Sequence, residues 1–207
     1  MHWSSYVITA LAAYLIGSIP TGYLIARLKG VDIRQTGSGN IGATNVFRTL
    51  GKPAGITVLL IDAVKGFIPT FLVRYILHHP DPTVMEYHAM TAGLFAILGH
   101  NYTCWLNFKG GKGIATSAGV LVALVPIALL ITLGGWILIF VLSRYVSLAS
   151  IGAAVLLPFA VWGTGGSGRM LILSSVLSVL AIYKHRGNIQ RLRRGTENRF
   201  GKKKVAQ

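Results

Sequence analysis

Carboxylates are scarce in this sequence: only five of its 207 residues are Asp or Glu, and charged residues of either sign make up 12% of the chain. A soluble domain of this size carries about a quarter charged residues. Long stretches contain no charge at all, which indicates that lipid rather than water surrounds much of the chain. The sequence therefore predicts an integral membrane protein.

Cysteine is almost absent as well. Cys104 is the only one, which excludes an intrachain disulfide bond and a cysteine-based zinc site, and we expect it to be a buried structural thiol. The two inner histidines, His100 and His185, and the scattered carboxylates are too few for a strong metal site, so we predict no metal and no cofactor. The remaining clustered histidines are predicted to be surface residues: His78, His79 and His88.

The apolar runs predict an all-α membrane protein of seven transmembrane helices, because hydrocarbon about 30 Å thick needs roughly 20 residues as a helix. The first run is too long for the core of a signal peptide and fits a retained span. The sequence allows two arrangements of the region 114–144, either two short spans or one long bent span, because only Pro126 and the pair Gly134–Gly135 interrupt it. The predicted spans are residues 4–28, 54–77, 87–106, 114–130, 131–144, 147–163 and 168–184.

The distribution of Lys and Arg predicts the orientation of these spans, because basic loops lie on the cytoplasmic side. Seven spans place four polar segments together: residues 29–53, 107–113, 145–146 and the tail from 185. All but three of the 20 Lys and Arg residues then fall on or near that side; the exceptions are Lys65, Arg74 and Arg169. We therefore predict that the amino terminus is outside and the carboxyl terminus is cytoplasmic.

The net charge of +15 does not indicate nucleic-acid binding, because basic residues beside membrane spans orient helices and contact anionic lipid. We expect membrane lipids as partners and no nucleic acid. The chain shows no clear internal repeat. We predict one membrane domain over residues 1–199 and a basic, disordered tail over residues 200–207.

The first polar loop is rich in glycine and in neutral donors. Glycines let backbone N–H groups approach an anion closely, and an arginine fork suits phosphate oxygens. The spacing formally matches a dinucleotide fingerprint, but that motif requires a preceding strand, and membrane helices flank this loop. The alternative is a flexible connector. The candidate phosphate-binding residues are Gly37, Ser38, Gly39, Asn40, Gly42, Thr44, Asn45 and Arg48.

The second polar loop, residues 107–113, places two ammonium groups and three glycines before an apolar helix. It is no Walker motif, since the spacing fails and Gly113 stands where Ser or Thr should follow the lysine. A helix N-terminus nevertheless favours phosphate. The alternative is an ordinary basic loop. The candidate residues here are Gly110, Gly111, Lys112 and Gly113.

The third segment, residues 184–198, predicts a short interfacial helix. Its spacing places His185, Asn188 and Leu192 on one face, and Glu197 is the only carboxylate of the tail. The alternative is a basic helix on the lipid surface. Because the predicted topology brings all three segments to one membrane face, they suggest a small phosphorylated ligand, and the lipid-embedded body suggests an apolar second substrate.

The charged residues within the spans are predicted to have structural roles rather than to bind substrate. Asp62 and Lys65 lie at i and i+3 and are predicted to form a structural ion pair, which lowers the cost of burying them; a role in shaping the site is the alternative. His100, beside Asn101, is predicted to be a helix-packing hydrogen bonder rather than a base.

Acyl transfer to a phosphate monoester is the reaction that these features favour, although no Ser-His-Asp arrangement and no His-x4-Asp pattern is present. At this point the whole chain up to Gly201 resembles the PlsY family, the bacterial acyl-phosphate:glycerol-3-phosphate acyltransferases. Four segments carry the resemblance: GSIP at 17–20, GSGNIGATN at 37–45, GHNYTCWLNFKGGKG at 99–113 and KHRGNIQRLRRGTE at 184–197.

The resemblance implies a seven-helix enzyme of the bacterial inner membrane whose active site faces the cytoplasm. It would acylate the 1-hydroxyl of glycerol 3-phosphate with acyl phosphate, giving lysophosphatidic acid for phospholipid synthesis. The acyl-phosphate-producing enzyme is a candidate partner. The implied catalytic residues are Ser38, Arg48, Lys112, His185 and Asn188, and Glu197 would orient basic residues of the tail.

Two points stay open. The resemblance implies that no protein side chain is a dedicated base, because the donor phosphate takes the proton of the attacking hydroxyl, but His185 as general base is an alternative. A small transporter or channel for an organic phosphate is the other class of protein that basic loops fit, although the chain lacks the internal repeats typical of transporters.

Overall fold

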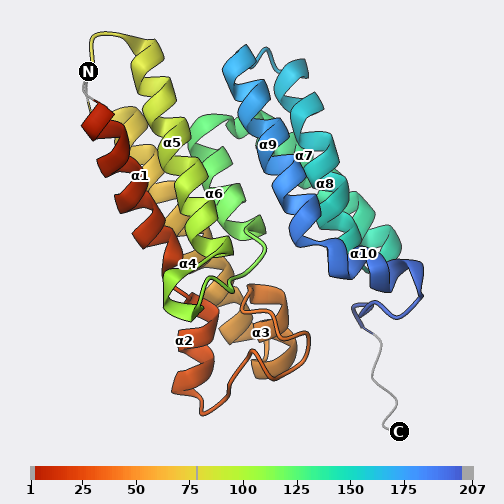
Figure 1. The fold of residues 1–207 in the computed structure, drawn as a ribbon. Helices are drawn as coiled ribbons and strands as arrows, with labels where there is room; N and C mark the ends of the chain where they lie inside the picture. The colour runs from red at the N-terminus through yellow and green to blue at the C-terminus, as the bar shows by residue number, and fades with distance from the viewer. Residues whose placement is uncertain (1–2, 78, 202–207) are drawn as a thin grey trace, which may run out of the picture. The chain divides into compact units, whose positions relative to one another are not determined.

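The computed structural model describes residues 3–77 and 79–201, and the regular elements among them are helices. The chain forms two compact units, residues 1–126 and 127–207. In Figure 1 the first unit runs from red to green and the second from green to blue. Each unit is described by itself.

Among the residues that the structure describes, unit 1 contains six α-helices, one π-helix and one 3-10 helix. Its elements are α1 (Trp3–Ser18), α2 (Thr21–Leu28), α3 (Ala43–Leu50), α4 (Lys52–Phe71), the π-helix η1 (Leu72–Ile76), α5 (Pro82–Asn101), the 3-10 helix η2 (Cys104–Leu106) and α6 (Ile114–Leu124).

Glycines bring α1 and α5 into close contact. A Cβ atom at Gly17 would collide with the backbone of Ala96, and one at Gly99 would collide with the carbonyl oxygen of Tyr14. Small residues at such crossings let helix backbones approach in lipid, where no hydrophobic effect drives helices together. The pair α1–α5 is therefore held at a spacing that larger side chains would not permit.

The pair α4–α6 is built in the same way. Gly66 of α4 packs against the carbonyl oxygen of Thr116, and Gly119 of α6 packs against that of Ala63. With α4 and α5 also in contact, unit 1 is a tight bundle whose helices α1, α4, α5 and α6 lie side by side (Figure 1).

The first apolar segment is not one continuous helix. It stops at Ser18 and restarts at Thr21, because Pro20 has no backbone N–H to donate and its ring disfavours a helical conformation in the residue before it. The predicted span 4–28 therefore consists of α1 and the shorter α2, which leads into the first polar loop.

Unit 2 consists of α7 (Pro126–Ser143), α8 (Val146–Gly163), α9 (Gly168–Lys184) and α10 (Arg186–Arg193). Helices α8 and α9 pack together, and α10 lies against both. The indole nitrogen of Trp136 donates to Ser150 Oγ at 3.2 Å, which links α7 to α8. The short helix predicted from residue 185 is confirmed as α10, and its position at the membrane interface stays a prediction.

Within residues 3–77 and 79–201, four helical segments are long and apolar enough to cross a membrane by length and composition: Trp3–Leu28, Lys52–Ile76, Pro126–Ser143 and Val146–Gly163. The seven-span count and the orientation stay predictions. The region 114–144 does form two helices, but the predicted border between residues 130 and 131 is wrong. Helix α7 begins at Pro126, whose missing N–H costs nothing at a helix start, and Gly134 and Gly135 lie inside it.

Some local predictions need correction. His88 is buried rather than at the surface, and His79 is half-buried. His78 lies outside the described residues. Cys104 is half-buried rather than buried. Phe200, the first residue of the predicted disordered tail, donates its N–H to the carbonyl oxygen of Arg144 at 2.8 Å, whereas residues 202–207 lie outside the described part.

Candidate functional site

The first polar loop is organised around one buried amide, that of Asn45. Its Oδ1 atom accepts the backbone N–H of Ser38 at 2.9 Å. Its Nδ2 atom lies 3.3, 3.0 and 2.9 Å from the carbonyl oxygens of Ile33, Thr36 and Asn40. The side chain, 3% exposed, therefore satisfies backbone groups along eight residues of loop and fixes the loop's curvature.

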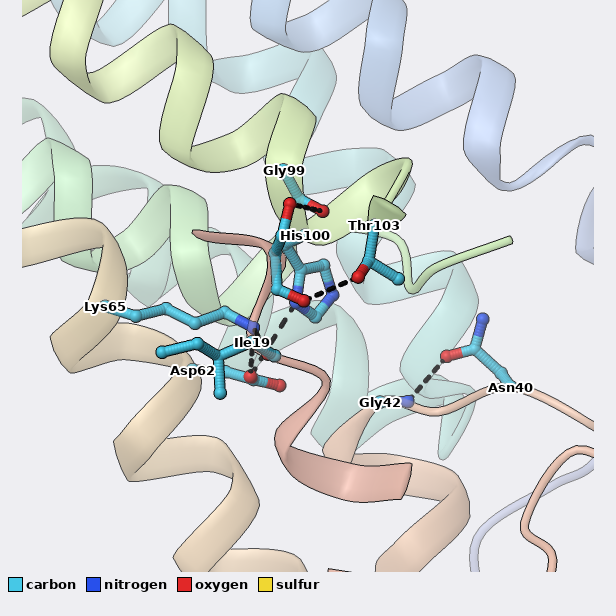
Figure 2. A network of polar contacts seen from close by, with 9 residues as sticks. Ile19, Asn40, Gly42, Asp62, Lys65, Gly99, His100 and Thr103 are labelled. Atoms are coloured by element: carbon cyan, nitrogen blue, oxygen red, sulfur yellow. Dashed lines mark hydrogen bonds and ion pairs between the residues drawn. The ribbon is translucent and has the colours of Figure 1, made fainter. Parts of the chain in front are cut away.

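Glycines are required where this loop turns around the amide. Gly37 and Gly39 have φ angles of 63° and 70°, in the left-handed region that favours glycine. A Cβ atom at Gly37 would also collide with Oδ1 of Asn45. The next turn is closed by Asn40, whose Oδ1 accepts the N–H of Gly42 at 2.8 Å (Figure 2). The loop thus presents exposed Ser38 at its outer side.

Gly42 caps α3, the helix that carries the arginine predicted to bind phosphate. Arg48 is exposed, and Thr44 precedes it by four residues, so the two lie on the same face of α3. Asn45 and Val46 are buried on the opposite side. The face of α3 that carries Thr44 and Arg48 is therefore directed away from its buried side.

An apolar cluster brings the two polar loops of unit 1 together. Leu106 of η2, at the start of the second loop, packs in one cluster with Ile33, Ile41 and Val46 of the first loop and α3. The cluster also contains Ala26, Ala54 and Val58. The predicted proximity of the loops is thus explained by ordinary burial of apolar side chains.

The second loop folds back on the end of α5. The N–H of Gly110 donates to the carbonyl oxygen of Asn101 at 3.2 Å, and that of Gly111 donates to the carbonyl oxygen of His100 at 3.0 Å. A Cβ atom at Gly111 would collide with Nε2 of His100. Lys112 is half-buried, one residue before Gly113, which caps α6 with a φ angle of 78°.

A buried ionic cluster lies beneath this loop. Lys65 Nζ is 2.8 Å from Asp62 Oδ1 and donates to the carbonyl oxygen of Ile19 at 2.7 Å, as Figure 2 shows. The Nδ1 atom of His100 lies 3.7 Å from the same carboxylate oxygen. The predicted Asp62–Lys65 pair is confirmed, but sequence spacing alone does not identify His100 as its third member.

In unit 2 the end of α9 places a histidine at the start of α10. His185 is 3% exposed, and its Nδ1 lies 2.8 Å from the carbonyl oxygen of Ala181. A carbonyl oxygen can only accept, so Nδ1 carries the hydrogen of this bond. Nε2 is then the nitrogen through which the ring could accept a proton, or bind an anion when it is charged.

Glu197 joins three elements of unit 2. Its Oε1 accepts from Asn188 Nδ2 at 2.8 Å and from Ser147 Oγ at 3.0 Å, and Oε2 accepts from Arg191 Nε at 2.7 Å. Burial by itself would raise the pKa of Glu197, but the hydrogen bonds from Asn188, Arg191 and Ser147 outweigh it and lower the pKa. Ser147 is a partner that the sequence does not reveal.

The structure therefore gathers the predicted residues in two groups, one in each unit. Those of the first two segments lie in unit 1, and His185, Asn188 and Glu197 lie in unit 2. The convergence of both groups on one ligand stays a prediction. Among the predicted residues the exposed ones are Gly37, Ser38 and Arg48; the buried ones are Asn45, Gly111, Gly113, His185 and Asn188; the half-buried ones are Gly39, Asn40, Gly42, Thr44, Gly110, Lys112 and Glu197.

The similarity to known proteins extends over both units. The sequence profile of the family described as "Glycerol-3-phosphate acyltransferase" matches residues 7–195. The glycerol-3-phosphate acyltransferase of Geobacter sulfurreducens is 50% identical over 194 residues, which are 94% of this chain and 96% of that protein. The one from Geotalea daltonii is 47% identical over 197 residues, or 95% and 98%.

Solved structures agree with the sequence comparison. Two crystal structures of PlsY, an integral membrane glycerol 3-phosphate acyltransferase, are similar to this chain at 43% sequence identity. Each comparison covers 95% of this chain and 96% of the other. The TM-score is 0.88 for the glycerol 3-phosphate form and 0.85 for the lysophosphatidic acid form.

Proposed function

The chain belongs to the glycerol-3-phosphate acyltransferase family and is an integral membrane acyltransferase, and on this premise we propose that its acyl donor is acyl phosphate. The acyl group would pass to the 1-hydroxyl of glycerol 3-phosphate, giving lysophosphatidic acid and inorganic phosphate. The observation that carries this proposal is the packing of the Lys112 loop against the Ser38 loop through Leu106.

Both loops suit an anionic ligand. Lys112 lies two residues before Ile114, the first residue of α6, and the free N–H groups and dipole of a helix N-terminus attract phosphate. Arg48 adds a planar guanidinium that can bind two phosphate oxygens at once. The Ser38 loop would contribute the hydroxyl of exposed Ser38, since the backbone N–H groups of Ser38, Gly39 and Gly42 are donated within the loop. These groups would hold glycerol 3-phosphate and the phosphate of the donor close together despite their mutual repulsion.

The proposed reaction requires little covalent chemistry from the protein. The oxygen of the substrate hydroxyl forms a bond to the acyl carbonyl carbon, the bond from that carbon to the phosphate oxygen breaks, and the hydroxyl proton passes to a phosphate oxygen of the donor. The leaving group is thus also the proton acceptor. Positioning two reactants and stabilising the developing oxyanion would then supply most of the rate enhancement.

His185 has two proposed roles that its geometry accommodates equally. With Nδ1 hydrogen-bonded to the carbonyl oxygen of Ala181, a neutral ring could accept the substrate's proton at Nε2, and a charged ring could bind phosphate there. Asn188, one helical turn along α10, would be its polar partner. Glu197 holds Asn188 and Arg191 by hydrogen bonds and would orient them rather than contact the reacting atoms.

We place the site at the cytoplasmic face of the bacterial inner membrane. Water-soluble glycerol 3-phosphate and a lipid-borne acyl donor can meet at that interface, and the basic loops fit the cytoplasmic side. Membrane lipids and an acyl-phosphate-producing enzyme are the partners that this location favours. Labelling of cysteines introduced at Ser38, Lys112 and His185 from one side of the bilayer would support the location, and labelling from opposite sides would contradict it.

The central experiment uses the purified full-length protein with acyl phosphate and radiolabelled glycerol 3-phosphate. We expect a lipid-soluble radioactive product, and none when acyl-CoA or acyl carrier protein replaces acyl phosphate. A product formed only with a thioester donor would overturn the proposed donor. Uptake of glycerol 3-phosphate into liposomes without any acylated product would instead favour a transporter.

A further inference from the structure

The break between α1 and α2 places the carbonyl group of Ile19 outside the regular helical ladder, because Pro20 interrupts the helix. The carbonyl oxygen of Ile19 accepts the backbone N–H of Thr21 at 3.0 Å. It also accepts a hydrogen bond from the ammonium of Lys65 at 2.7 Å, and Lys65 in turn lies 2.8 Å from Asp62. An ion pair on α4 therefore holds the point from which α2 and the Ser38 loop depart.

The same break is tied to the end of α5 by two further hydrogen bonds. Thr103 Oγ1 donates to the carbonyl oxygen of Ser18 at 2.6 Å, and Ser18 Oγ donates to that of Gly99 at 3.4 Å. Figure 2 shows these links beside the Asp62–Lys65 pair. We call the residues that make these links the anchor cluster: Ser18, Ile19, Asp62, Lys65, His100 and Thr103.

His100 connects the anchor cluster to the second loop. Its Nδ1 faces Asp62 at 3.7 Å, its carbonyl oxygen accepts the N–H of Gly111 at 3.0 Å, and its Nε2 lies so close to Gly111 that no Cβ atom fits between them. The residue that follows Gly111 is Lys112. A shift of the His100 ring would therefore displace the loop that carries this ammonium group.

Burial makes the anchor cluster a rigid element. Asp62, Lys65 and His100 are 2%, 5% and 4% exposed, and charges at such depth are stable only when they are paired and hydrogen-bonded. A pair needed only for stability could lie anywhere along α4. This one is placed where it contacts the backbone before the first anion-binding loop and the histidine beneath the second.

We propose that Asp62, Lys65 and His100 are positioning residues that set the separation between the Ser38 loop and the Lys112 loop. This inference rests on the proposed function, because it assigns the two loops to one bound phosphate ester. None of the three residues needs to touch substrate. Their effect is on the affinity for glycerol 3-phosphate, through the geometry of the two loops.

The main test removes the ion pair without leaving a lone buried charge. In the double variant Asp62→Asn/Lys65→Met, we expect the KM for glycerol 3-phosphate to rise roughly tenfold or more, the order of coupling seen within connected networks, and kcat to change less. Lys65→Arg keeps a cation and a donor for Ile19 and should restore most of the affinity. An unchanged KM in the folded double variant would overturn the proposal.

The matched control is His88→Phe, a second buried histidine on α5. Its ring packs against Tyr6 and its nitrogens contact Ser5 and the carbonyl oxygen of Val84, so it contacts none of the anchor cluster. We expect wild-type KM in this variant. A rise equal to that of the double variant would show that any loss of a buried polar group in unit 1 has the same effect, and would contradict the proposal.

A distance measurement gives a readout that does not depend on turnover. Spin labels on cysteines at exposed Gln35 and Lys109, with Cys104→Ser, report the separation of the two loops by pulsed electron resonance. We expect a broader or shifted distribution in the double variant and the wild-type distribution in His88→Phe. If the double variant does not fold, His100→Phe carries the same test beside its control His88→Phe, and an unchanged distribution and KM there would overturn the proposal.

The two proposals fail in different ways. Loss of the proposed function would appear as absence of acylated product from wild-type protein, whatever the spin-label distances are. Failure of the positioning role would appear as wild-type distances and KM in the variants while the wild-type enzyme turns over normally.

Discussion

The backbone N–H of Ser38 lies 2.9 Å from Oδ1 of Asn45, so the predicted phosphate loop is held by one of its own side chains. The bond spans seven residues, and the amide nitrogen of Asn45 donates to carbonyl groups within the same stretch. Asn45, which the sequence suggests as a direct phosphate donor, is therefore occupied by the loop itself. Asn45 therefore contributes to phosphate binding indirectly, by fixing the shape of the loop.

Asn45→Asp is expected to destabilise this loop strongly. A carboxylate cannot donate to the carbonyl oxygens of Ile33, Thr36 and Asn40, and it would place a buried charge among them. We expect a loss of about 3 kcal/mol in the free energy of unfolding, the usual scale for unsatisfied buried polar groups. Thermal unfolding of the detergent-solubilised protein would measure it.

Asn107→Asp is the matched control for this substitution. Asn107 is exposed and has a φ angle of 51°, a conformation that aspartate also tolerates. We expect wild-type stability. Equal destabilisation by both variants would mean that added negative charge near the loops, and not the hydrogen bonds of Asn45, causes the effect.

Removing a cation from the proposed phosphate site should abolish most turnover without unfolding the protein. We expect Arg48→Ala and Lys112→Ala each to lower kcat/KM by about a hundredfold or more, the scale for losing one charge-stabilising donor. Arg48→Lys should recover only part of this, because an ammonium cannot bind two oxygens in the arginine geometry. Lys52→Ala removes an exposed cation just after α3 and serves as the control, with near wild-type rates in the acylation assay expected.

Acid should weaken unit 2 through Glu197. Because its folded-state pKa is lowered, its ionised form stabilises the fold fully above the ordinary glutamate pKa of about 4.3. This stabilisation is lost as the pH falls through the lower, folded-state pKa. We expect the melting temperature of Glu197→Gln to be lower than that of wild type at neutral pH and to converge with it once the pH falls below the lowered pKa of Glu197. Parallel pH profiles would contradict the assignment.

His185→Ala separates the two proposed roles of the imidazole. If His185 is the general base, the wild-type rate falls toward acid pH as the imidazole is protonated, and the variant loses this acid limb of the pH–rate profile. If the histidine only binds phosphate, the KM for glycerol 3-phosphate rises in the variant and no acid limb is lost. The profiles should be measured at saturating acyl phosphate, so that donor binding does not distort them.

Local features of the fold follow from the sequence to different degrees. Helix α10 is predictable because its polar and buried positions repeat with helical spacing. The border between α6 and α7 is mispredicted because Gly134 and Gly135 are read as an interruption, whereas membrane helices tolerate glycine and start readily at proline. His88 is mispredicted because nothing in its neighbours in sequence shows that Ser5 and Tyr6 of α1 cover it.

In the candidate site, too, the sequence predicts some features and not others. Glycine-rich spacing and basic residues identify the Ser38 and Lys112 loops, because those residue types carry the chemistry themselves. The contacts of Ser147 with Glu197, and of His100 with Asp62 and Gly111, join residues that are distant in sequence. Such contacts depend on which helices pack together, and spacing along one chain carries no information about that.

The hydrogen bond from Lys65 to the carbonyl group of Ile19 has an evolutionary consequence. That carbonyl lies outside the helical ladder because Pro20 breaks the helix, and Lys65 donates to it beside the N–H of Thr21, so a change at position 20 alters what the lysine at position 65 contacts. In an alignment of related enzymes we expect positions 20 and 65 to covary: chains that replace the proline by a helix-forming residue should also lack the lysine and its aspartate.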